Sequence, residues 1–189
     1  MKIITGSAKG MSLFTLEGDM TRPTSQRVKE AVFSMLQFEI DNAVVLDLFA
    51  GSGQLGLEAL SRGAKRAYFS DSSREAVDII IKNAKKSRLN DKCVISWCDY
   101  KQMMQKVSGK EIFDLVFIDP PYKDKIIVGA LSELLRLGLV NERTKIICES
   151  AEEDIFAGNE PLKNKFDIVK QARYSISYIT ILNPRASEE

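Results

Sequence analysis

The residues best suited to chemistry form a tetrapeptide in the second half of the chain, Asp119-Pro120-Pro121-Tyr122. They follow directly on an apolar run, FDLVFI, that is typical of a buried strand. Two prolines fix φ and donate no hydrogen bonds, so they hold an extended, rigid loop at the carboxyl end of that strand. Because ligands bind at this edge of open α/β sheets, we expect the tetrapeptide to line a ligand site.

The side chains of this loop suit transfer of a methyl group to an exocyclic amine of a nucleic-acid base. Such a nitrogen is a poor nucleophile because its lone pair is delocalised into the ring. Asp119 and the carbonyl of Pro120 could accept from its two hydrogens and aim the lone pair at an activated methyl group. Tyr122 would stack on the base, a contact worth about 1–3 kcal/mol in single-strand binding. The alternative is a proline-rich turn beside a half-buried tyrosine.

A second motif, DLFAGSGQLG over residues 47–56, joins a strand to a helix. Glycines there let the backbone approach a ligand, and the helix N-terminus presents unpaired N–H groups. Gly51, Gly53 and Gly56 spell GxGxxG, with Asp71 about twenty residues after Gly51, which also fits the dinucleotide fingerprint. A nicotinamide dinucleotide is therefore an alternative ligand for this loop.

Asp47 discriminates between the two cofactors. Its carboxylate, at the end of the first strand and pointing toward the pocket beside the loop, would repel a pyrophosphate and attract the ammonium of S-adenosylmethionine. Asp71 ends the second strand and could accept from both ribose hydroxyls of either cofactor, whereas Asp99, after the third strand, could accept from an adenine amino group. The alternative is that Asp47 caps the loop and that Asp71 and Asp99 cap helices.

The composition excludes several other kinds of site. The chain has no histidine, which removes a Ser-His-Asp triad and the commonest zinc ligand. Cys93, Cys98 and Cys148 form no CxxC pair, so we expect small core residues and no metal site. A net charge of +1 argues against a long electrostatic footprint on naked RNA or DNA. Lacking a membrane-length apolar run and a signal peptide, the protein is expected in the cytoplasm, without a membrane partner.

These site residues need a sheet to position them. Alternating apolar runs and helical periodicities predict one α/β domain over residues 1–189 with a mostly parallel sheet. The expected strands are residues 43–48, 67–70, 94–97, 113–118, 145–148, 166–169 and 174–182. Helices are expected through residues 55–60 and over residues 126–137. A third helix is expected after a capping box at 72–75, with Val77, Ile80, Ile81 and Ala84 on one face.

Residues 1–40 are predicted to be an N-terminal extension packed on this core. Residues 2–5 and 11–16 could form a small hairpin across 6–10. A helix is then expected to begin near Thr24, with an apolar face formed by Val28, Ala31, Val32, Met35 and Leu36.

The chain resembles the bacterial 16S ribosomal RNA guanine-N2 methyltransferases (RsmD-like) along nearly its whole length. The matching segments are TRPT at 21–24 with Arg27 and residues 30–31, VLDLFAGSG at 45–53, LEALSRGA at 57–64 and FDLVFIDPPY at 113–122. Many amino-methyltransferases share DPPY, whereas TRPT joined to DLFAGSG is more specific. The chain departs from the family pattern at Ser72-Ser73, Ser150 and Ser175.

The resemblance implies a class I S-adenosylmethionine-dependent methyltransferase fold, a Rossmann-like seven-stranded sheet with helices on both faces. It implies methylation of the N2 amine of a guanine in 16S ribosomal RNA. The small net charge suits a partly assembled small subunit as substrate better than naked RNA, and we expect the enzyme to be a monomer. The expected cofactor-binding residues are Asp47, Phe49, Gly51, Gly53, Asp71, Ser72, Asp99 and Tyr100. The expected catalytic residues are Asp119, Pro120, Pro121 and Tyr122, and the expected substrate-binding residues are Thr21, Arg22, Pro23, Thr24, Arg27 and Lys123.

Other functions stay open at this point. Thr24 could simply cap its helix. Arg22, Arg27 and Lys123 could contact phosphates around a guanine flipped out of its stack, or they could form a solvated face of the protein. The same DPPY chemistry would serve an adenine-N6 methyltransferase acting on DNA or RNA. A nucleotide- or RNA-binding module without catalysis is a further alternative. A protein-glutamine methyltransferase is disfavoured, since that family typically has Asn in place of Asp119.

Overall fold

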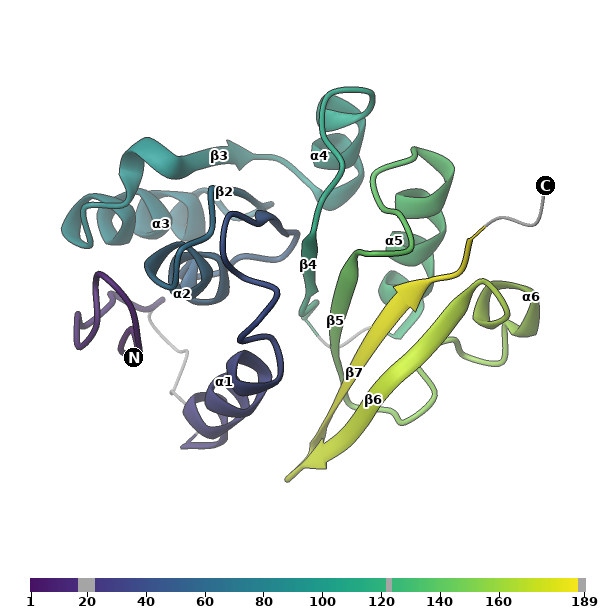
Figure 1. Ribbon diagram of the computed structural model, residues 1–189. Helices are drawn as coiled ribbons and strands as arrows, with labels where there is room; N and C mark the ends of the chain where they lie inside the picture. Colours follow the sequence, from purple (N-terminus) through teal and green to yellow (C-terminus); the bar gives the residue numbers. More distant parts are fainter. Residues whose placement is uncertain (17–22, 122–123, 187–189) are drawn as a thin grey trace.

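A computed structural model describes residues 1–16, 23–121 and 124–186, and for residues 23–25 and 124–125 it describes the backbone only. A seven-stranded sheet forms the centre of the molecule, in the order β3-β2-β1-β4-β5-β7-β6 (Figure 1). The strands are β1 (Val44–Asp47), β2 (Arg66–Asp71), β3 (Cys93–Trp97), β4 (Leu115–Ile118), β5 (Lys145–Ser150), β6 (Phe166–Tyr174) and β7 (Ser177–Pro184). The first five are parallel and β7 is antiparallel to both of its neighbours. This topology is that of class I methyltransferases, as the resemblance implied.

Helices cover both faces of the sheet, as predicted. They are α1 (Pro23–Met35), α2 (Gln54–Ser61), α3 (Arg74–Lys86), α4 (Tyr100–Val107), α5 (Asp124–Arg136) and α6 (Glu160–Lys163), with a 3-10 turn η1 (Asn90–Lys92). One core joins α1, α2 and α3 to Val45, Phe69 and Phe117. The other joins α4, α5 and α6 to Leu46 and Val116 on the opposite face. The alternation along β1 and β4 follows from the two-residue period of a strand buried on both sides.

Each predicted strand of the parallel part lies within two residues of an observed one. The prediction for residues 174–182 is wrong at its start, because β6 runs to Tyr174 and the chain turns before Ser177. Ser175 has φ 57°, the left-handed conformation of a tight turn. The alternation of apolar and serine residues that suggested one strand therefore spans a hairpin turn.

The helix predictions need three corrections. Ser73 caps α3, with its side chain accepting from the Ala76 backbone, so the expected capping box from Ser72 to Glu75 does not form. Ile81 is only half-buried, and Ile79 takes its place in the core. Thr24 lies inside α1, which begins at Pro23, and so does not precede the helix as a cap. Helices α4 and α6 had no counterpart in the prediction.

The expected N-terminal hairpin is reduced to a minimal one. Lys2 and Ser12 form an isolated antiparallel bridge, and Ile3 donates its N–H to the carbonyl of Met11 at 3.0 Å. Gly6 turns with φ 88° and packs so tightly on α2 that an added Cβ would lie 1.7 Å from the carbonyl oxygen of Ser61. The segment therefore takes its shape from docking on α2 rather than from its own strand pairing.

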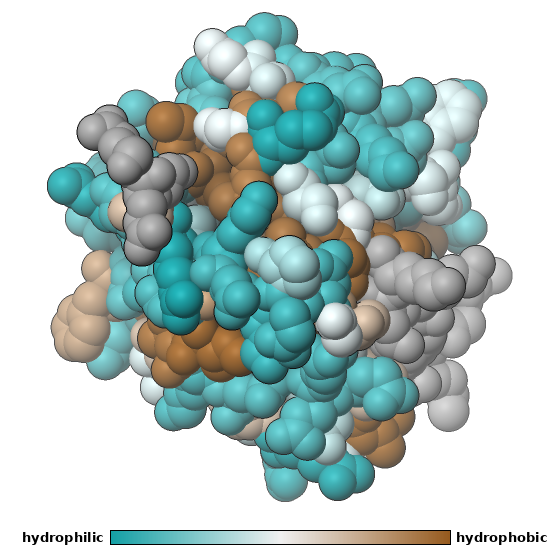
Figure 2. Space-filling model, turned by 90° about the vertical axis from the view of Figure 1, so that its right-hand side faces the viewer, coloured by the Kyte–Doolittle hydropathy of each residue, from teal (hydrophilic) through white to brown (hydrophobic). Residues whose placement is uncertain are grey.

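The surface of the molecule is mixed. The face that carries α5, α6 and the C-terminal strands is largely hydrophilic, with hydrophobic residues in separate small groups (Figure 2). No helix among the described residues is long and apolar enough to cross a bilayer.

Candidate functional site

The glycine loop turns tightly between β1 and α2. Gly53 precedes the helix with φ 78° and donates its N–H to the carbonyl of Ala50 at 2.6 Å. Gly56 has a different role, since an added Cβ would lie 2.3 Å from the buried ring of Phe69 on β2. The absence of a side chain at Gly56 therefore lets α2 lie directly on the sheet, which places the loop at its carboxyl edge.

Asp47 lies beneath this loop and is only 2% exposed. Its Oδ2 accepts from the Gly56 N–H at 3.2 Å, which is its one hydrogen bond within the described residues. Burial raises the pKa of Asp47 to about 7; the charge of Asp71 raises it as well, and the Gly56 hydrogen bond opposes the shift. The carboxylate thus does hold the end of the loop through Gly56 in the first turn of α2, and it is also a buried group whose charge a cationic ligand would stabilise.

Asp71 and Asp99 organise the neighbouring loops. Asp71 accepts from the Gly51 N–H at 2.9 Å and from the Ser73 N–H at 2.8 Å, so it ties the glycine loop to the turn around Ser72. Asp99 caps α4 in a capping box with Gln102, accepting from its N–H at 2.9 Å. A carboxylate has about four acceptor sites, so each of these roles leaves room for bonds to a ligand.

An aromatic pair lies behind the same loops. Phe49, which follows β1, packs on Tyr100 at the start of α4, with ring centroids 5.3 Å apart. Tyr100 also approaches α5, where an added Cβ on Gly129 would lie 3.1 Å from its hydroxyl. The pair fixes α4 and its cap Asp99 relative to the glycine loop.

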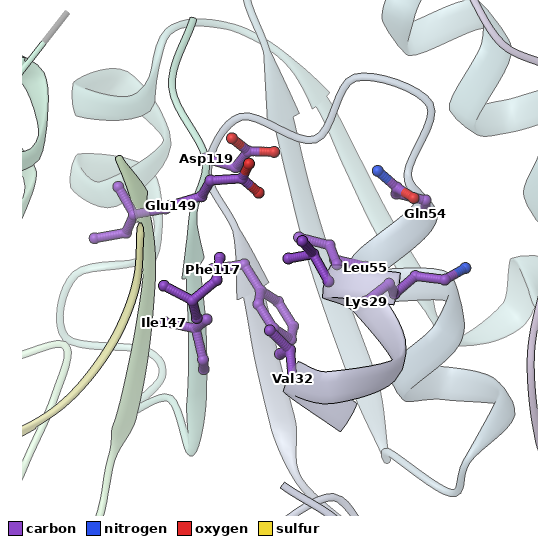
Figure 3. Close-up of a pocket in the computed structure, with 11 residues that line it drawn as sticks. Lys29, Val32, Gln54, Leu55, Phe117, Asp119, Ile147 and Glu149 are labelled. Atoms are coloured by element: carbon purple, nitrogen blue, oxygen red, sulfur yellow. The ribbon is translucent and has the colours of Figure 1, made fainter. Parts of the chain in front are cut away.

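A pocket opens beside the end of β4 (Figure 3). Asp119 and Glu149 point into it from β4 and β5, and Gln54 faces it from the start of α2. The other walls come from α1, α2, β4, β5 and β7 and are mainly apolar, formed by Val28, Val32, Leu55, Phe117, Ile147 and Ile179 with Lys29. Pro120 is buried and Pro121 exposed, as a rigid loop at the rim requires. The pocket could therefore bind a flat ligand between apolar walls, with the two carboxylates at one end.

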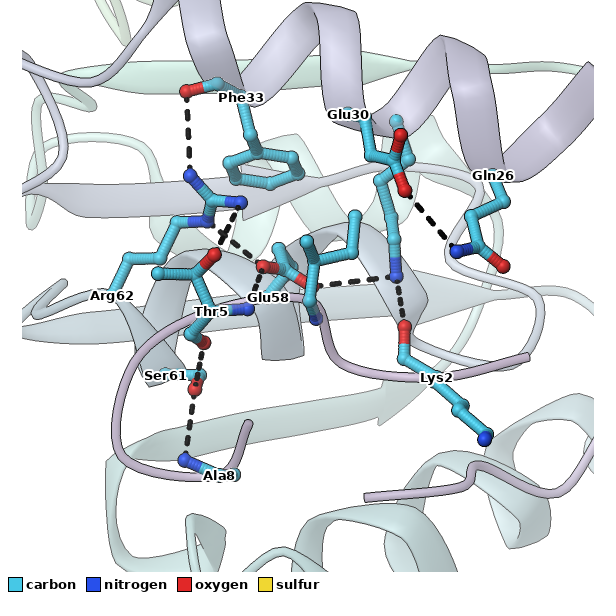
Figure 4. A network of polar contacts seen from close by, with 12 residues as sticks. Lys2, Thr5, Ala8, Gln26, Glu30, Phe33, Glu58, Ser61 and Arg62 are labelled. Atoms are coloured by element: carbon cyan, nitrogen blue, oxygen red, sulfur yellow. Dashed lines mark hydrogen bonds and ion pairs between the residues drawn. The ribbon is translucent and has the colours of Figure 1, made fainter. Parts of the chain in front are cut away.

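The ammonium group of Lys29 is engaged away from that pocket. It donates to the carbonyl of Lys2 at 2.6 Å and pairs with Glu58 at 3.3 Å, with both side chains almost fully buried (Figure 4). Glu58 also accepts from the backbone N–H groups of Ile4 and Thr5 at 2.7 and 3.0 Å. This network joins α1, α2 and the N-terminal segment, so it fixes the helix that forms one wall of the pocket.

Only some of the predicted substrate-binding residues lie within the described part of the chain. Arg27 lies exposed on α1, one residue before the pocket-lining Val28, and Pro23 and Thr24 lie in the first turn of this helix. Thr21, Arg22, Tyr122 and Lys123 lie outside the described residues. The structure therefore brings α1, whose first turn contains Pro23 and Thr24, to the pocket that contains Asp119.

Three contributing residues were missed by the sequence predictions. Glu149 and Gln54 line the pocket, and buried Asn83 on α3 donates to the carbonyls of Ser52 and Phe14 at 2.9 and 3.0 Å. Glu149 follows an apolar run at the carboxyl end of a predicted strand, a position that could have singled it out. Nothing in the sequence around Asn83 indicated a role near the site, except that it is a polar residue on an apolar helix face.

The residues present fit S-adenosylmethionine better than a dinucleotide. Asp47 puts a buried carboxylate where a pyrophosphate would otherwise approach the loop, while an ammonium would relieve its burial. Asp71 and Asp99 place further acceptors at the ends of β2 and β3, suited to hydroxyl and amino donors. Within the described ranges no cluster of cysteine, aspartate and glutamate could hold a metal ion.

Comparison with known proteins gives consistent matches. Residues 1–183 match the model of a family described as "Conserved hypothetical protein 95". The ribosomal RNA small subunit methyltransferase D of Escherichia coli K12 is 33% identical over 154 residues, covering 82% of this chain and 76% of the relative. The Haemophilus influenzae protein of the same name is 30% identical over 154 residues, covering 81% of this chain and 80% of the relative.

Solved structures share the fold. YhhF from Escherichia coli superposes with a TM-score of 0.84 at 26% identity and covers 99% of both chains. TTHA0928 from Thermus thermophilus gives a TM-score of 0.76 at 25% identity, over 96% of this chain and 98% of that one. SMU.776, solved with SAH, gives 0.63 at 14% identity over 80% of this chain and 49% of the other, a likeness of fold alone.

Proposed function

We propose that this chain, which belongs to the family described as conserved hypothetical protein 95 and is an S-adenosylmethionine-dependent methyltransferase, methylates the N2 amine of a guanine in 16S ribosomal RNA. One observation carries the proposal. The carboxylate of Asp119 points into a pocket with apolar walls at the carboxyl edge of the sheet, next to the glycine loop. The names of the two methyltransferase D relatives supply the class of RNA.

The cofactor, when bound, supplies a methyl group already activated by a sulfonium. In this proposal Asp47 holds its ammonium, and Asp71 and Asp99 accept from its ribose and adenine. The loop around Gly51 and Gly53 lies against it. These assignments follow from the donor and acceptor character of the residues at the ends of β1, β2 and β3.

Asp119 acts on the other reactant. Its carboxylate and the Pro120 carbonyl accept from the two hydrogens of the target amine, which turns the lone pair out of the plane of the ring. The apolar walls contributed by Val32 and Phe117 exclude water, so these hydrogen bonds act in a low dielectric. Tyr122 stacks on the base, and Arg22, Arg27 and Lys123 contact phosphates around the flipped nucleotide.

The small net charge favours RNA already bound to proteins, rather than naked RNA, as the substrate. A chain of net charge +1 lacks the basic excess with which proteins hold naked RNA through its phosphates. We propose that the substrate is a partly assembled small subunit in the cytoplasm, whose ribosomal proteins already shape the RNA.

The test measures transfer of labelled methyl groups from S-adenosylmethionine to unmethylated small ribosomal subunits. We expect label in guanine N2, reduced about 100-fold or more by Asp119→Ala because a preorganised acceptor is lost. Asp78→Ala, a change of an exposed carboxylate on α3, is the matched control and should keep the wild-type rate. Label in adenine, or equal rates for Asp119→Ala and wild type, would contradict the proposal.

A further inference from the structure

The pocket beside Asp119 is rich in hydrogen-bond acceptors. Asp119 and Glu149 bring two carboxylates to it, and the buried Oε1 of Gln54 has no hydrogen-bond partner within the described residues. The ammonium of Lys29 is engaged with Glu58 and with the carbonyl of Lys2. A ligand for this pocket should therefore present several hydrogen-bond donors on one edge.

The position of Glu149 follows from the register of the sheet. In the parallel pair β4–β5, Phe117 pairs with Ile147 and Ile118 with Cys148, so Asp119 and Glu149 come next and lie side by side. Both share the strand face of Phe117, which α1 and α2 cover. Figure 3 shows the two carboxylates at the same end of the pocket.

Two neighbouring carboxylates distinguish guanine from adenine. Next to its N2 amine, guanine carries a hydrogen on ring atom N1, so the N1 and N2 positions of its Watson–Crick edge both present donors. Next to its N6 amine, adenine carries a bare lone pair on N1. An ionised carboxylate only accepts hydrogen bonds, so a second one beside Asp119 stabilises guanine and repels adenine.

We propose that Glu149 selects guanine by accepting the hydrogen bond from N1–H while Asp119 accepts from the N2 amine. The inference rests on the proposed guanine methylation and adds the residue that sets base specificity. Glu149 contacts the base and takes no part in the transfer of the methyl group.

The test replaces the methylated guanine, once mapped, by 2-aminopurine in ligated RNA reconstituted into subunits. This base keeps the 2-amino group and lacks the hydrogen on N1. The kcat/KM ratio for guanine over 2-aminopurine is compared between wild type and Glu149→Gln, which cancels the intrinsic reactivity of the two bases. We expect the ratio to fall about 100-fold in the variant, because its amide can donate to the bare N1 and the charged acceptor is lost.

Three further variants and measurements make the result decisive. Glu152→Gln changes an exposed glutamate just after β5 and should leave the ratio unchanged. Glu149→Asp keeps the charge and should retain the preference for guanine at a lower rate. The affinity for S-adenosylmethionine, measured by calorimetry, should be equal in all variants, which shows that each is folded.

The outcomes separate this inference from the proposed function. Equal loss of activity on both bases in Glu149→Gln, with an unchanged ratio, would mean that Glu149 only supports the pocket and would overturn the inference alone. Absence of label in guanine with the wild-type enzyme would overturn the proposed function, and the inference with it.

Discussion

The environment of Asp47 predicts that cofactor binding depends on pH. Because burial raises its pKa to about 7, part of the free protein carries a proton there at neutral pH. An ammonium ligand favours the ionised form, so that proton must leave when the cofactor binds. Affinity for S-adenosylmethionine should therefore fall as the pH is lowered through 7, approaching tenfold per pH unit below it.

Calorimetry between pH 6 and pH 8 would measure this effect. Asp47→Asn should bind the cofactor weakly and lose the pH dependence, whereas Asp78→Asn on α3 should behave as wild type. If Asp47→Asn keeps the same pH profile, another group titrates and the assignment of Asp47 is wrong.

At the level of secondary-structure elements, the close packing of α2 on β2 requires a residue without a side chain at Gly56. In Gly56→Ala the new Cβ would lie 2.3 Å from the ring of Phe69, which is fully buried and closely surrounded. We expect a loss of about 1–3 kcal/mol in the free energy of unfolding, although alanine favours a helix by about 1 kcal/mol over glycine. Denaturant unfolding would measure the change.

Gly129→Ala is the matched control for this prediction, since Gly129 also lies within a helix. Its added Cβ would meet the hydroxyl of half-buried Tyr100 at 3.1 Å, and that group lies at the far end of a side chain. The loss of stability should be clearly smaller than for Gly56→Ala. Equal losses would show that the packing against Phe69 is not what requires a glycine.

The buried network around Glu58 joins α1, α2 and the N-terminal segment, which are far apart in the chain (Figure 4). Glu58→Gln would leave the buried ammonium of Lys29 without its counter-charge, a loss of about 3–5 kcal/mol. Burial lowers the pKa of Lys29 below its ordinary value, and Glu58 opposes that shift. The native variant thus binds fewer protons than the unfolded chain at alkaline pH, so its stability should recover as the pH rises.

Unfolding of Glu58→Gln at pH 7 and pH 9 would check both the loss and the recovery. Glu30→Gln, on the exposed side of α1, should cost less than about 0.5 kcal/mol. A stability difference between Glu58→Gln and wild type that stays constant with pH would show that Lys29 is not the group responsible.

The fold class, the family and the cofactor can all be inferred from the amino-acid sequence. The apolar runs are long enough to require a sheet buried on both faces, and the motifs DLFAGSG and DPPY lie at strand ends, where the chemistry of each residue can be read locally. The prediction of a class I fold and of the family resemblance is confirmed. The roles of the individual site residues stay predictions.

Which residues from distant segments share the pocket became clear from the packing of the folded chain. Glu149 and Asp119 meet because two parallel strands are aligned in register, and Lys29 pairs with Glu58 because α1 packs beside α2. The turn at Ser175 was likewise hidden, since a period of two continues across a hairpin. These features depend on strand pairing and helix packing between segments far apart in the chain, which local patterns of hydrophobicity do not specify.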